Sequence, residues 1–315
     1  MNANADPLAP YRGKLIGLAY RMLGSRADAE DVLQDAYLRF RDARAVDNPE
    51  AFLMTTVTRL CLDRLKSAKA KRETYVGPWL PEPIVDSEAL TPQAATELAD
   101  DLSFALLLAL ERLSPAERGA FLLQDVFDMP SVDVAVILGK SAAACRQLAT
   151  RARKAVRAAR PATTTPTESH ARLFAEFLNA VGSGDVTRLA ALLREDAVML
   201  SDSGGLKPAA RKPIRGGAKV ARFFIGVTKK AALYTDNRSG AWSCEIRNIN
   251  GALGLLVYVD GVPEQALSIA IEDEKIAAIY SIRNPEKLAG LKDPARSATQ
   301  FVIIDSATDG ASISH

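Results

Sequence analysis

Apolar residues in the first quarter of the chain recur at the spacing of α-helices. Tyr11–Leu23 is one such segment, and Gly24 ends it. Ser25 is expected to cap the next helix, because Asp28 follows three positions later in capping-box spacing. The apolar stripe of this second helix consists of Ala29, Val32, Leu33, Ala36, Tyr37 and Phe40. A third helix is expected over residues 48–72, since an asparagine followed by proline is typical of a helix start.

A second helical segment lies further along the chain. A capping box with an internal proline begins a predicted helix over Ser114–Phe127. A short helix is expected over Val132–Leu138, after which Gly139 turns the chain. Ser141–Ala158 then forms a last helix, capped by its serine. Two helices joined by a glycine turn are typical of a helix-turn-helix.

The last large segment changes fold class. The pattern predicts, in order, helices at about 168–182 and 185–194, a strand near 197–200, a loop over 202–217, a helix near 219–229, and strands over 242–248, 253–259, 264–271 and 275–283. Helices followed by an antiparallel meander indicate an α+β fold in which a curved sheet wraps around helices.

Two breaks in composition give the expected domain boundaries. Prolines interrupt the stretch after Gly77, and the threonine- and proline-rich run over 161–167 has little to bury. We therefore expect domains at 1–75, 97–160 and 168–290, linkers at 76–96 and 161–167, and a flexible tail at 291–315.

The net charge of +2 hides an uneven distribution. Residues 134–167 contain seven basic residues and no acid, and residues 51–72 contain six basic residues and one acid. The stretch between these patches, over 98–133, is mainly acidic. Two basic patches on an acidic scaffold fit a protein that contacts phosphates at two places.

Cysteine and histidine are too few and too scattered to indicate a metal site. The three cysteines, Cys61, Cys145 and Cys244, lie far apart, and the chain has two histidines. We expect buried thiols, no metal, no cofactor and no catalytic residues. No run of about 18 apolar residues occurs, so we expect a soluble, cytoplasmic protein that does not enter a membrane.

The helix over 141–158 has the residue types of a DNA-reading helix. Its apolar positions, 145, 148, 149, 152 and 156, form one stripe that would be buried. The polar positions expected to face DNA are Ser141, Arg146, Gln147, Thr150, Arg151, Arg153 and Lys154. Arginine pairs with guanine edges and glutamine with adenine, and the others suit phosphates. The alternative is an ordinary basic surface helix.

These segments resemble extracytoplasmic function (ECF) sigma factors of RNA polymerase. Asp28–Phe40 resembles the helix of that family that binds core polymerase, and Asn48–Arg64 resembles its promoter −10 helix. Glu111–Arg118 and Gly139–Leu148 resemble its sigma-4 domain, which reads the −35 element. Each motif alone has a plainer explanation: an acidic first turn complements a helix dipole, and a basic helix end can simply be solvated. The resemblance covers about half of the chain, with two domains in the expected order.

Three further motifs resemble the ECF subgroup with a C-terminal SnoaL-like domain. Trp79–Pro83 is identical to the linker signature of this subgroup. Asp202–Lys207 resembles its Asp-Gly-Gly-Gly-Lys loop, with departures at Ser203 and Leu206, and Asn284–Leu288 resembles its Asn-Pro-Asp-Lys-Leu element. The resemblance implies two all-α domains, a sigma-2 helical bundle and a sigma-4 helix-turn-helix, followed by an α+β cone of the SnoaL-like or NTF2-like type.

The resemblance also implies the partners and the residues that contact them. An alternative sigma factor binds core RNA polymerase, at the beta-prime clamp and the beta flap, and directs initiation at −10/−35 promoters. The clamp would be met by Asp28, Asp31, Gln34 and Asp35. The −10 DNA would be met by Asn48, Arg59, Asp63, Arg64, Lys66 and Arg72, with a flipped base held near the loop over 44–48.

The C-terminal domain is expected to regulate the sigma domains by intramolecular contact. The residues implied in this contact are Trp79, Leu80, Pro81, Glu82, Pro83, Asp202, Gly204, Gly205, Lys207, Asn284, Pro285 and Lys287. Trp79 would act as a clasp, or would merely pack on its own domain. The pocket of the C-terminal domain would be open to an unknown small-molecule ligand. Residues 171–290 contain no histidine, and Asp202 is expected in a glycine-rich loop off any strand, so a positioned general base is not expected.

Two other functions compete with this interpretation. One is a SnoaL-type isomerase or cyclase with a DNA-binding tether, which requires carboxylates on cone-facing strand positions. The candidates, Asp260 and Glu264, are expected beside a turn. The other is a one-component DNA-binding regulator that senses a ligand and ignores polymerase. Association with core polymerase separates a sigma factor from both.

Overall fold

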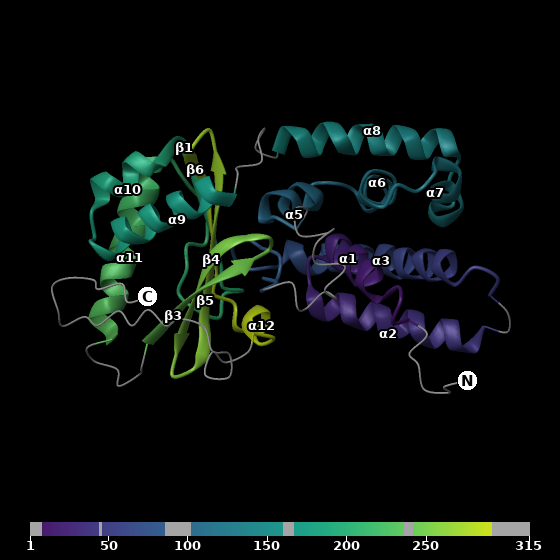
Figure 1. The fold of residues 1–315 in the computed structure, drawn as a ribbon, viewed down its shortest axis with the longest axis horizontal. Helices are drawn as coiled ribbons and strands as arrows, with labels where there is room; N and C mark the ends of the chain where they lie inside the picture. Colours follow the sequence, from purple (N-terminus) through teal and green to yellow (C-terminus); the bar gives the residue numbers. More distant parts are fainter. Residues whose placement is uncertain (1–7, 44–45, 86–101, 160–166, 236–241, 292–315) are drawn as a thin grey trace. The chain divides into compact units, whose positions relative to one another are not determined.

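The computed structural model describes residues 8–43, 46–85, 102–159, 167–235 and 242–291. The chain divides into two compact units, drawn in Figure 1. The N-terminal unit comprises Met1–Thr74 and Ser87–Arg160, and the C-terminal unit comprises Tyr75–Asp86 and Pro161–His315. The segment that follows the first helical domain thus groups with the last domain of the chain.

Three helices form the first bundle of the N-terminal unit: α1 (Arg12–Leu23), α2 (Arg26–Asp42) and α3 (Pro49–Glu73). Gly24 ends α1 with a left-handed φ of 70°, and the Ser25 hydroxyl caps α2 by accepting a hydrogen bond from the Asp28 amide at 3.2 Å. In α2 the first four positions of the predicted apolar stripe are buried, while Tyr37 and Phe40 are half-buried. The capping and periodicity therefore predict these helices correctly.

The second bundle contains α5 (Phe104–Glu111), α6 (Pro115–Phe121), the π-helix η3 (Leu122–Val126), α7 (Ser131–Leu138) and α8 (Ala142–Ala159). The helix predicted to run to Phe127 continues to Val126, but its hydrogen bonding changes from the α to the π pattern at Leu122. Gly139 turns the chain with a left-handed φ of 62°. All five apolar positions predicted for α8 are buried, so the helix-turn-helix is built as the pattern indicates.

One buried arginine joins the two bundles of the N-terminal unit. The Arg118 side chain on α6 is 3% exposed. It donates to the Met22 carbonyl at the end of α1, at 2.5 Å, and to the Glu111 carboxylate, at 2.7 Å. Burial lowers its pKa to about 10, so the guanidinium stays charged at neutral pH. The neighbouring Gly119 allows close packing, because a Cβ there would lie 3.3 Å from Leu138.

The C-terminal unit packs helices on one face of a six-stranded sheet (Figure 1). The helices of this layer are α9 (Thr167–Gly182), α10 (Val186–Leu192) and α11 (Gly217–Thr235); the short helix α12 (Pro285–Leu288) lies outside it, on the other side of the strands in Figure 1. Its strands are β1 (Leu193–Asp202), β2 (Ile214–Arg215), β3 (Trp242–Ile249), β4 (Ala252–Val259), β5 (Val262–Glu272) and β6 (Lys275–Ile282), in the order β2-β1-β6-β5-β4-β3. Phe177 and Phe224 pack with Ile269 and Ile279 in the core between the layers. The predicted α+β class is confirmed.

The sheet differs from the prediction at one edge. β3 to β6 form the expected antiparallel meander, but β1 pairs with β6 in parallel and continues through Asp202. The short strand β2 lies in the segment predicted as loop. The expectation that Asp202 lies off any strand is therefore wrong: it ends β1, and its side chain is fully buried. Glu264 likewise lies within β5, while Asp260 lies in the turn before it.

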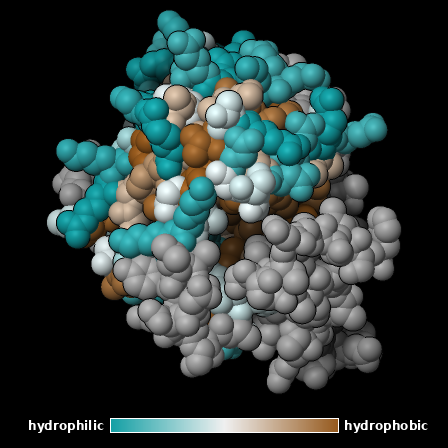
Figure 2. Space-filling model, turned by 90° about the vertical axis from the view of Figure 1, so that its left-hand side faces the viewer, coloured by the Kyte–Doolittle hydropathy of each residue, from teal (hydrophilic) through white to brown (hydrophobic). Residues whose placement is uncertain are grey.

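The face shown in Figure 2 is mainly hydrophilic, with apolar residues gathered near its centre. Among the described residues, no helix is long and apolar enough to cross a membrane. All three cysteines are buried and free, as expected from their spacing.

Replacing Arg118 by methionine tests whether the buried guanidinium holds the N-terminal unit together. The change removes the guanidinium that binds the Met22 carbonyl and the nearly buried Glu111. We expect the free energy of unfolding to fall by about 3 kcal/mol, the scale for breaking a buried ion pair. Chemical denaturation measures this. The control is Arg41→Met, which removes an exposed ion pair with Asp42 and should cost less than about 1 kcal/mol. Equal losses in the two variants would contradict this role for Arg118.

Candidate nucleic-acid interface

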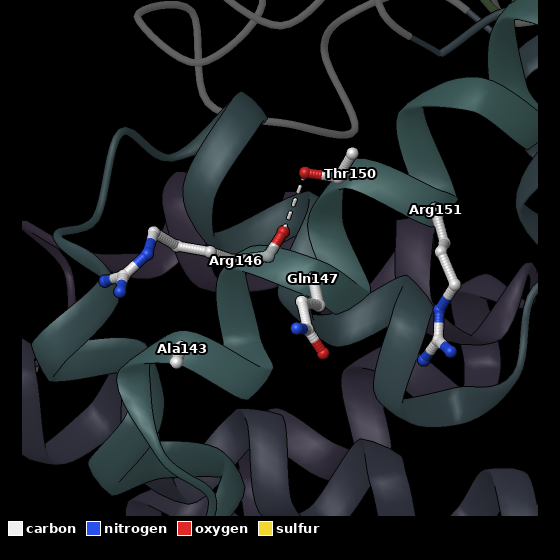
Figure 3. A pocket seen from close by; sticks show the side chains of 5 residues that line it. All are labelled: Ala143, Arg146, Gln147, Thr150 and Arg151. Carbon is white, nitrogen blue, oxygen red and sulfur yellow. Dashed lines mark hydrogen bonds between the residues drawn. The ribbon is translucent and has the colours of Figure 1, made fainter.

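The outer face of α8 is a shallow basic hollow. Ala143, Arg146, Gln147, Thr150 and Arg151 line it (Figure 3). The helix begins at Ala142, where the Ser141 hydroxyl accepts a hydrogen bond from the Ala144 amide at 3.1 Å. Because the buried stripe occupies the opposite face, these side chains are directed outward by the helix itself.

Figure 3 shows how the polar side chains of this hollow diverge. In this view Arg146 extends to the left and Arg151 extends downward, and Gln147 lies between them. The Thr150 hydroxyl donates to the Arg146 carbonyl at 2.9 Å, so its proton is used within the helix. The hollow thus offers an amide flanked by two guanidinium groups, a set that suits base edges and phosphates.

Scaffold acids hold two of the arginines of α8. Arg151 Nε lies 3.2 Å from the Glu117 carboxylate, and Arg153 Nε lies 2.5 Å from the Asp125 carboxylate. Lys154 is exposed on the outer face. The structure therefore brings Arg146, Gln147, Thr150 and Arg151 into one hollow, and leaves Ser141 as a cap and Arg153 on the flank. Ala143 lines the hollow and was not predicted; its place one turn before Gln147 is the indication of this in the sequence.

The residues predicted to contact −10 DNA do not share one site, and those that the structure describes make contacts of their own within the N-terminal unit. Arg59 on α3 donates to the Val136 and Ile137 carbonyls of α7, at 3.0 and 3.2 Å. Lys66 pairs with Asp63 at 2.8 Å on the surface of α3, where both side chains are 72% exposed. Asn48 caps α3 by accepting from the Ala51 amide at 3.0 Å. The side chain of Arg72 and loop positions 44 and 45 lie outside the described residues.

The acidic residues predicted for core polymerase share one arginine. Arg64 on α3 lies 3.4 Å from a carboxylate oxygen of each of three α2 aspartates, namely Asp28, Asp31 and Asp35. It also donates to the Asp28 carbonyl at 3.1 Å. Gln34 is exposed on the same helix. The acids therefore form one array on α2, and Arg64, which was predicted for DNA, lies against it.

Asp202 is the centre of a polar cluster in the C-terminal unit. One of its carboxylate oxygens accepts from the Tyr75 hydroxyl at 2.6 Å. The other accepts from the Leu80 amide at 2.8 Å and the Lys287 ammonium at 2.7 Å. The Gly204 amide donates to the first oxygen at 3.1 Å. Four donors thus occupy a carboxylate that has no exposed surface.

Lys287 and Asn284 complete this cluster. The Lys287 ammonium lies 4.2 Å from the Trp79 ring centre and 5.2 Å from that of Tyr75, within cation–π range. It also donates to the Leu80 carbonyl. Asn284 donates to the Tyr75 hydroxyl at 2.9 Å. Burial and the Asp202 hydrogen bond raise the pKa of Tyr75 well above its ordinary value, so the hydroxyl keeps its proton.

The remaining predicted regulatory residues lie at several places around this cluster. Leu80, Pro81 and Pro83 are buried, while Glu82 is half-buried. Lys207 pairs with Glu264 on β5 and does not reach Asp202 in this arrangement. Gly204 and Gly205 both have left-handed φ values, 59° and 78°, which favour glycine. Glu286 follows Pro285 in α12 and donates its amide to the Asn284 cap.

A second anchor of this segment lies at the β3–β4 turn. The Ile84 amide donates to the Asn250 side chain at 3.0 Å, and the Asn250 amide donates to the Ile84 carbonyl at 2.8 Å. Val85 forms a bridge with Ile249. Neither Tyr75 nor Asn250 was predicted, because both lie outside the quoted motifs and pair across long stretches of sequence.

Two family models match the N-terminal unit. Residues 8–71 match Sigma-70 region 2, and residues 103–156 match Sigma-70, region 4. The ECF RNA polymerase sigma factor SigJ of Mycobacterium tuberculosis is 41% identical over 290 residues, covering 89% of this chain and 91% of the relative. The chain belongs to the ECF sigma factors. A probable SigI from the same species is 30% identical over 292 residues, covering 91% of this chain and 94% of the relative.

The solved structures include one that spans most of this ECF sigma factor. The crystal structure of M. tuberculosis SigJ aligns with a TM-score of 0.72 at 38% identity, covering 89% of this chain and 96% of that one. The order of two sigma domains and a C-terminal α+β domain, expected from the motifs, is therefore confirmed.

Replacing Asp202 by asparagine tests the polar cluster around it. The change removes the carboxylate charge that the Lys287 ammonium, only 13% exposed, contacts at 2.7 Å. We expect the C-terminal unit to lose about 3 kcal/mol of stability. Hydrogen exchange at the Leu80 amide should then accelerate about a hundredfold, if its protection depends on opening of this cluster. Glu195→Gln, which removes an exposed charge from β1, is the control. Unchanged exchange in Asp202→Asn would contradict the anchoring role.

Proposed function

We propose that this ECF sigma factor binds core RNA polymerase and directs initiation at promoters with −10 and −35 elements. The observation that carries the proposal is the outer face of α8, where an amide and two arginines are presented together in one hollow. A recognition helix in a helix-turn-helix enters the major groove with such side chains directed at base edges. The relatives named as ECF RNA polymerase sigma factors support the same assignment.

On this proposal the −35 element is contacted by α8. Gln147 reads an adenine edge, and Arg146, Arg151, Arg153 and Lys154 contact guanine edges or phosphates. Ser141 and Thr150 lie at the start and in the middle of this face. Lys154 is exposed on the outer face, which suits a phosphate contact.

The −10 element is assigned to the α3 side of the first bundle, through Asn48, Arg59, Asp63, Arg64, Lys66 and Arg72. Arg59 uses its guanidinium on two carbonyls of α7. Contact of Arg59 with DNA therefore requires α3 and α7 to separate, so the arrangement of the N-terminal unit described here is a resting state. Core polymerase, whose clamp would meet Asp28, Asp31, Gln34 and Asp35 and whose flap would meet the second bundle, is the partner that opens it.

The C-terminal unit, which we assign to the SnoaL-like type, regulates through the segment Tyr75–Asp86. Asp202, Asn284 and Lys287 bind this segment directly. The segment lies between the two sigma domains in the sequence, so its attachment limits how far those domains can separate. A role for Asp202 as a general base is disfavoured, because four donors already occupy its oxygens. This favours regulation over the isomerase alternative.

The central experiment combines core-polymerase pull-down with transcription from a promoter library. A sigma factor co-elutes with core and yields transcripts with a defined start site. A one-component regulator binds DNA without core and yields no such transcript. Failure of both co-elution and start-site-specific transcription would overturn the proposal.

Replacing Lys154 by glutamine tests phosphate contact by α8. Loss of one phosphate contact should reduce the slope of log affinity against log salt by about 0.9, because one fewer counterion is released. Fluorescence anisotropy of the holoenzyme on promoter DNA over a salt series measures this slope. Lys219→Gln, which removes an exposed charge from α11, is the control and should leave the slope unchanged. An unaltered slope for Lys154→Gln would remove this residue from the phosphate contacts.

Two variants test regulation by the attached segment. Trp79→Ala and Lys287→Met break the same cation–π contact from opposite sides. Both should shift transcript yield in the same direction by at least about twofold, because each releases the same segment. Single-round transcription measures yield, and thermal unfolding of the N-terminal unit checks that both sigma domains stay folded. Shifts of opposite sign, or no shift, would contradict regulation through this contact.

A further inference from the structure

Two ion pairs flank the reading helix, and both use the same atom of arginine. Glu117 contacts Nε of Arg151, and Asp125 contacts Nε of Arg153. Contact at Nε holds one edge of a guanidinium and leaves its two terminal amino groups at the far end of the side chain. Those two groups form the fork that pairs with O6 and N7 of guanine.

Glu117 is itself fixed in place. It is the third residue of α6, and one carboxylate oxygen accepts from the Ser114 hydroxyl at 2.7 Å and from the Ser114 amide at 3.1 Å. The other oxygen is the one that faces Arg151. The hydrogen bond from the Ser114 hydroxyl holds the pKa of Glu117 below its usual value, so the carboxylate stays charged. A capping box therefore provides a rigid anchor for a flexible arginine.

We propose that Glu117 is a positioning residue for −35 recognition, which holds Arg151 so that its terminal amino groups read one guanine. The inference rests on the proposed function, in which α8 meets the −35 element. Glu117 does not touch DNA in this proposal, and it acts through Arg151 alone.

Glu117 is expected to have opposite effects on the specificity and on the affinity of DNA binding. A carboxylate near the DNA-facing surface repels phosphates, so it lowers binding to every sequence. In return it restricts a long side chain to one orientation, so less conformational entropy is lost when the correct base is met. An acid in this position is therefore unfavourable for general attraction to DNA and favourable for discrimination between bases.

Arg146 provides an internal comparison on the same helix. It extends away from Arg151, to the left in Figure 3, and it makes no ion pair within the described part of the chain. An arginine that is free to reorient suits a phosphate, which accepts hydrogen bonds from many directions. The two arginines of the hollow thus have different expected roles: Arg151 reads a base, and Arg146 adds affinity.

The decisive variant is Glu117→Gln. Glutamine also supports the capping box, so the helix start is kept while the charge that holds Arg151 is removed. The probe is a promoter duplex library randomised over the −35 element, bound by holoenzyme and sequenced. We expect the preference for guanine at one position to fall about fivefold or more, the lower end for a bidentate contact. Total library binding should stay equal or become tighter.

Two other variants complete the experiment. Asp133→Asn removes an exposed acid from the first turn of α7, and should change total binding without changing any base preference. Arg151→Lys keeps the charge and loses the fork, so it should reduce the same guanine preference as Glu117→Gln. It tests the proposal independently if Glu117→Gln weakens the fold, which thermal unfolding detects.

The outcomes distinguish this inference from the proposed function. If the parent holoenzyme enriches no −35 sequence, −35 reading by α8 fails. If the parent enriches a sequence but Glu117→Gln keeps every base preference, or if Arg151→Lys reduces preference at a different position, the positioning role is overturned. A loss of guanine preference at one shared position in both variants, absent in Asp133→Asn, supports it.

Discussion

The buried guanidinium of Arg118 is the contact on which the N-terminal unit depends. A charged group that is 3% exposed is stable only when its hydrogen-bonding partners are in place. One partner, Glu111, belongs to the second bundle, and the other, the Met22 carbonyl, ends a helix of the first. That carbonyl is one of the groups a helix leaves without an internal partner.

Arg59 makes the reverse contact, from the first bundle to two carbonyls of α7. Each bundle thus provides an arginine that donates hydrogen bonds to backbone carbonyls near a helix end of the other bundle.

This reciprocity explains why basic residues in this protein cannot be assigned to DNA from charge alone. Arg59 binds carbonyls, Arg64 lies among three aspartates, and Arg151 and Arg153 each contact a scaffold acid. Exposed pairs of this kind contribute about 1 kcal/mol or less to stability, so they add little to holding the fold together. The buried contact of Arg118 is of a different order, because removing its partner leaves a desolvated charge. The buried contact therefore maintains the fold, while the exposed pairs contribute little to it.

Much of the fold follows from local rules in the sequence. The serine caps before α2, α6 and α8, the glycine turns at Gly24 and Gly139, and the apolar stripe of α8 each depend on a few neighbouring residues. Local patterns in the sequence do not indicate which strands and side chains pair when they lie far apart along the chain. The parallel pairing of β1 with β6 extends β1 to Asp202, and no periodicity near Asp202 indicates this. The π-helix at Leu122 is likewise not indicated by the sequence, because its apolar residues fit an α-helix as well.

In the candidate interface, residue types predicted which side chains face outward on α8. They did not predict which of these side chains form ion pairs with acids of the scaffold.

The segment Tyr75–Asp86 is part of the C-terminal unit, although it precedes the second bundle in the sequence. It has no helical or strand periodicity, so its sequence reads as a linker, yet hydrogen bonds at both ends attach it to the C-terminal unit. Asp202 binds Leu80 through its backbone amide, a contact that does not depend on side-chain identity at position 80. The side chains of Trp79 and Tyr75 instead surround Lys287, the cation that neutralises Asp202. The two aromatic rings therefore stabilise the Lys287 ammonium, and the ammonium in turn neutralises the buried Asp202 carboxylate. The carboxylate then fixes the path of the chain between the two sigma domains in the sequence. A change at any one of these groups acts on all the others, which makes this cluster suited to regulation.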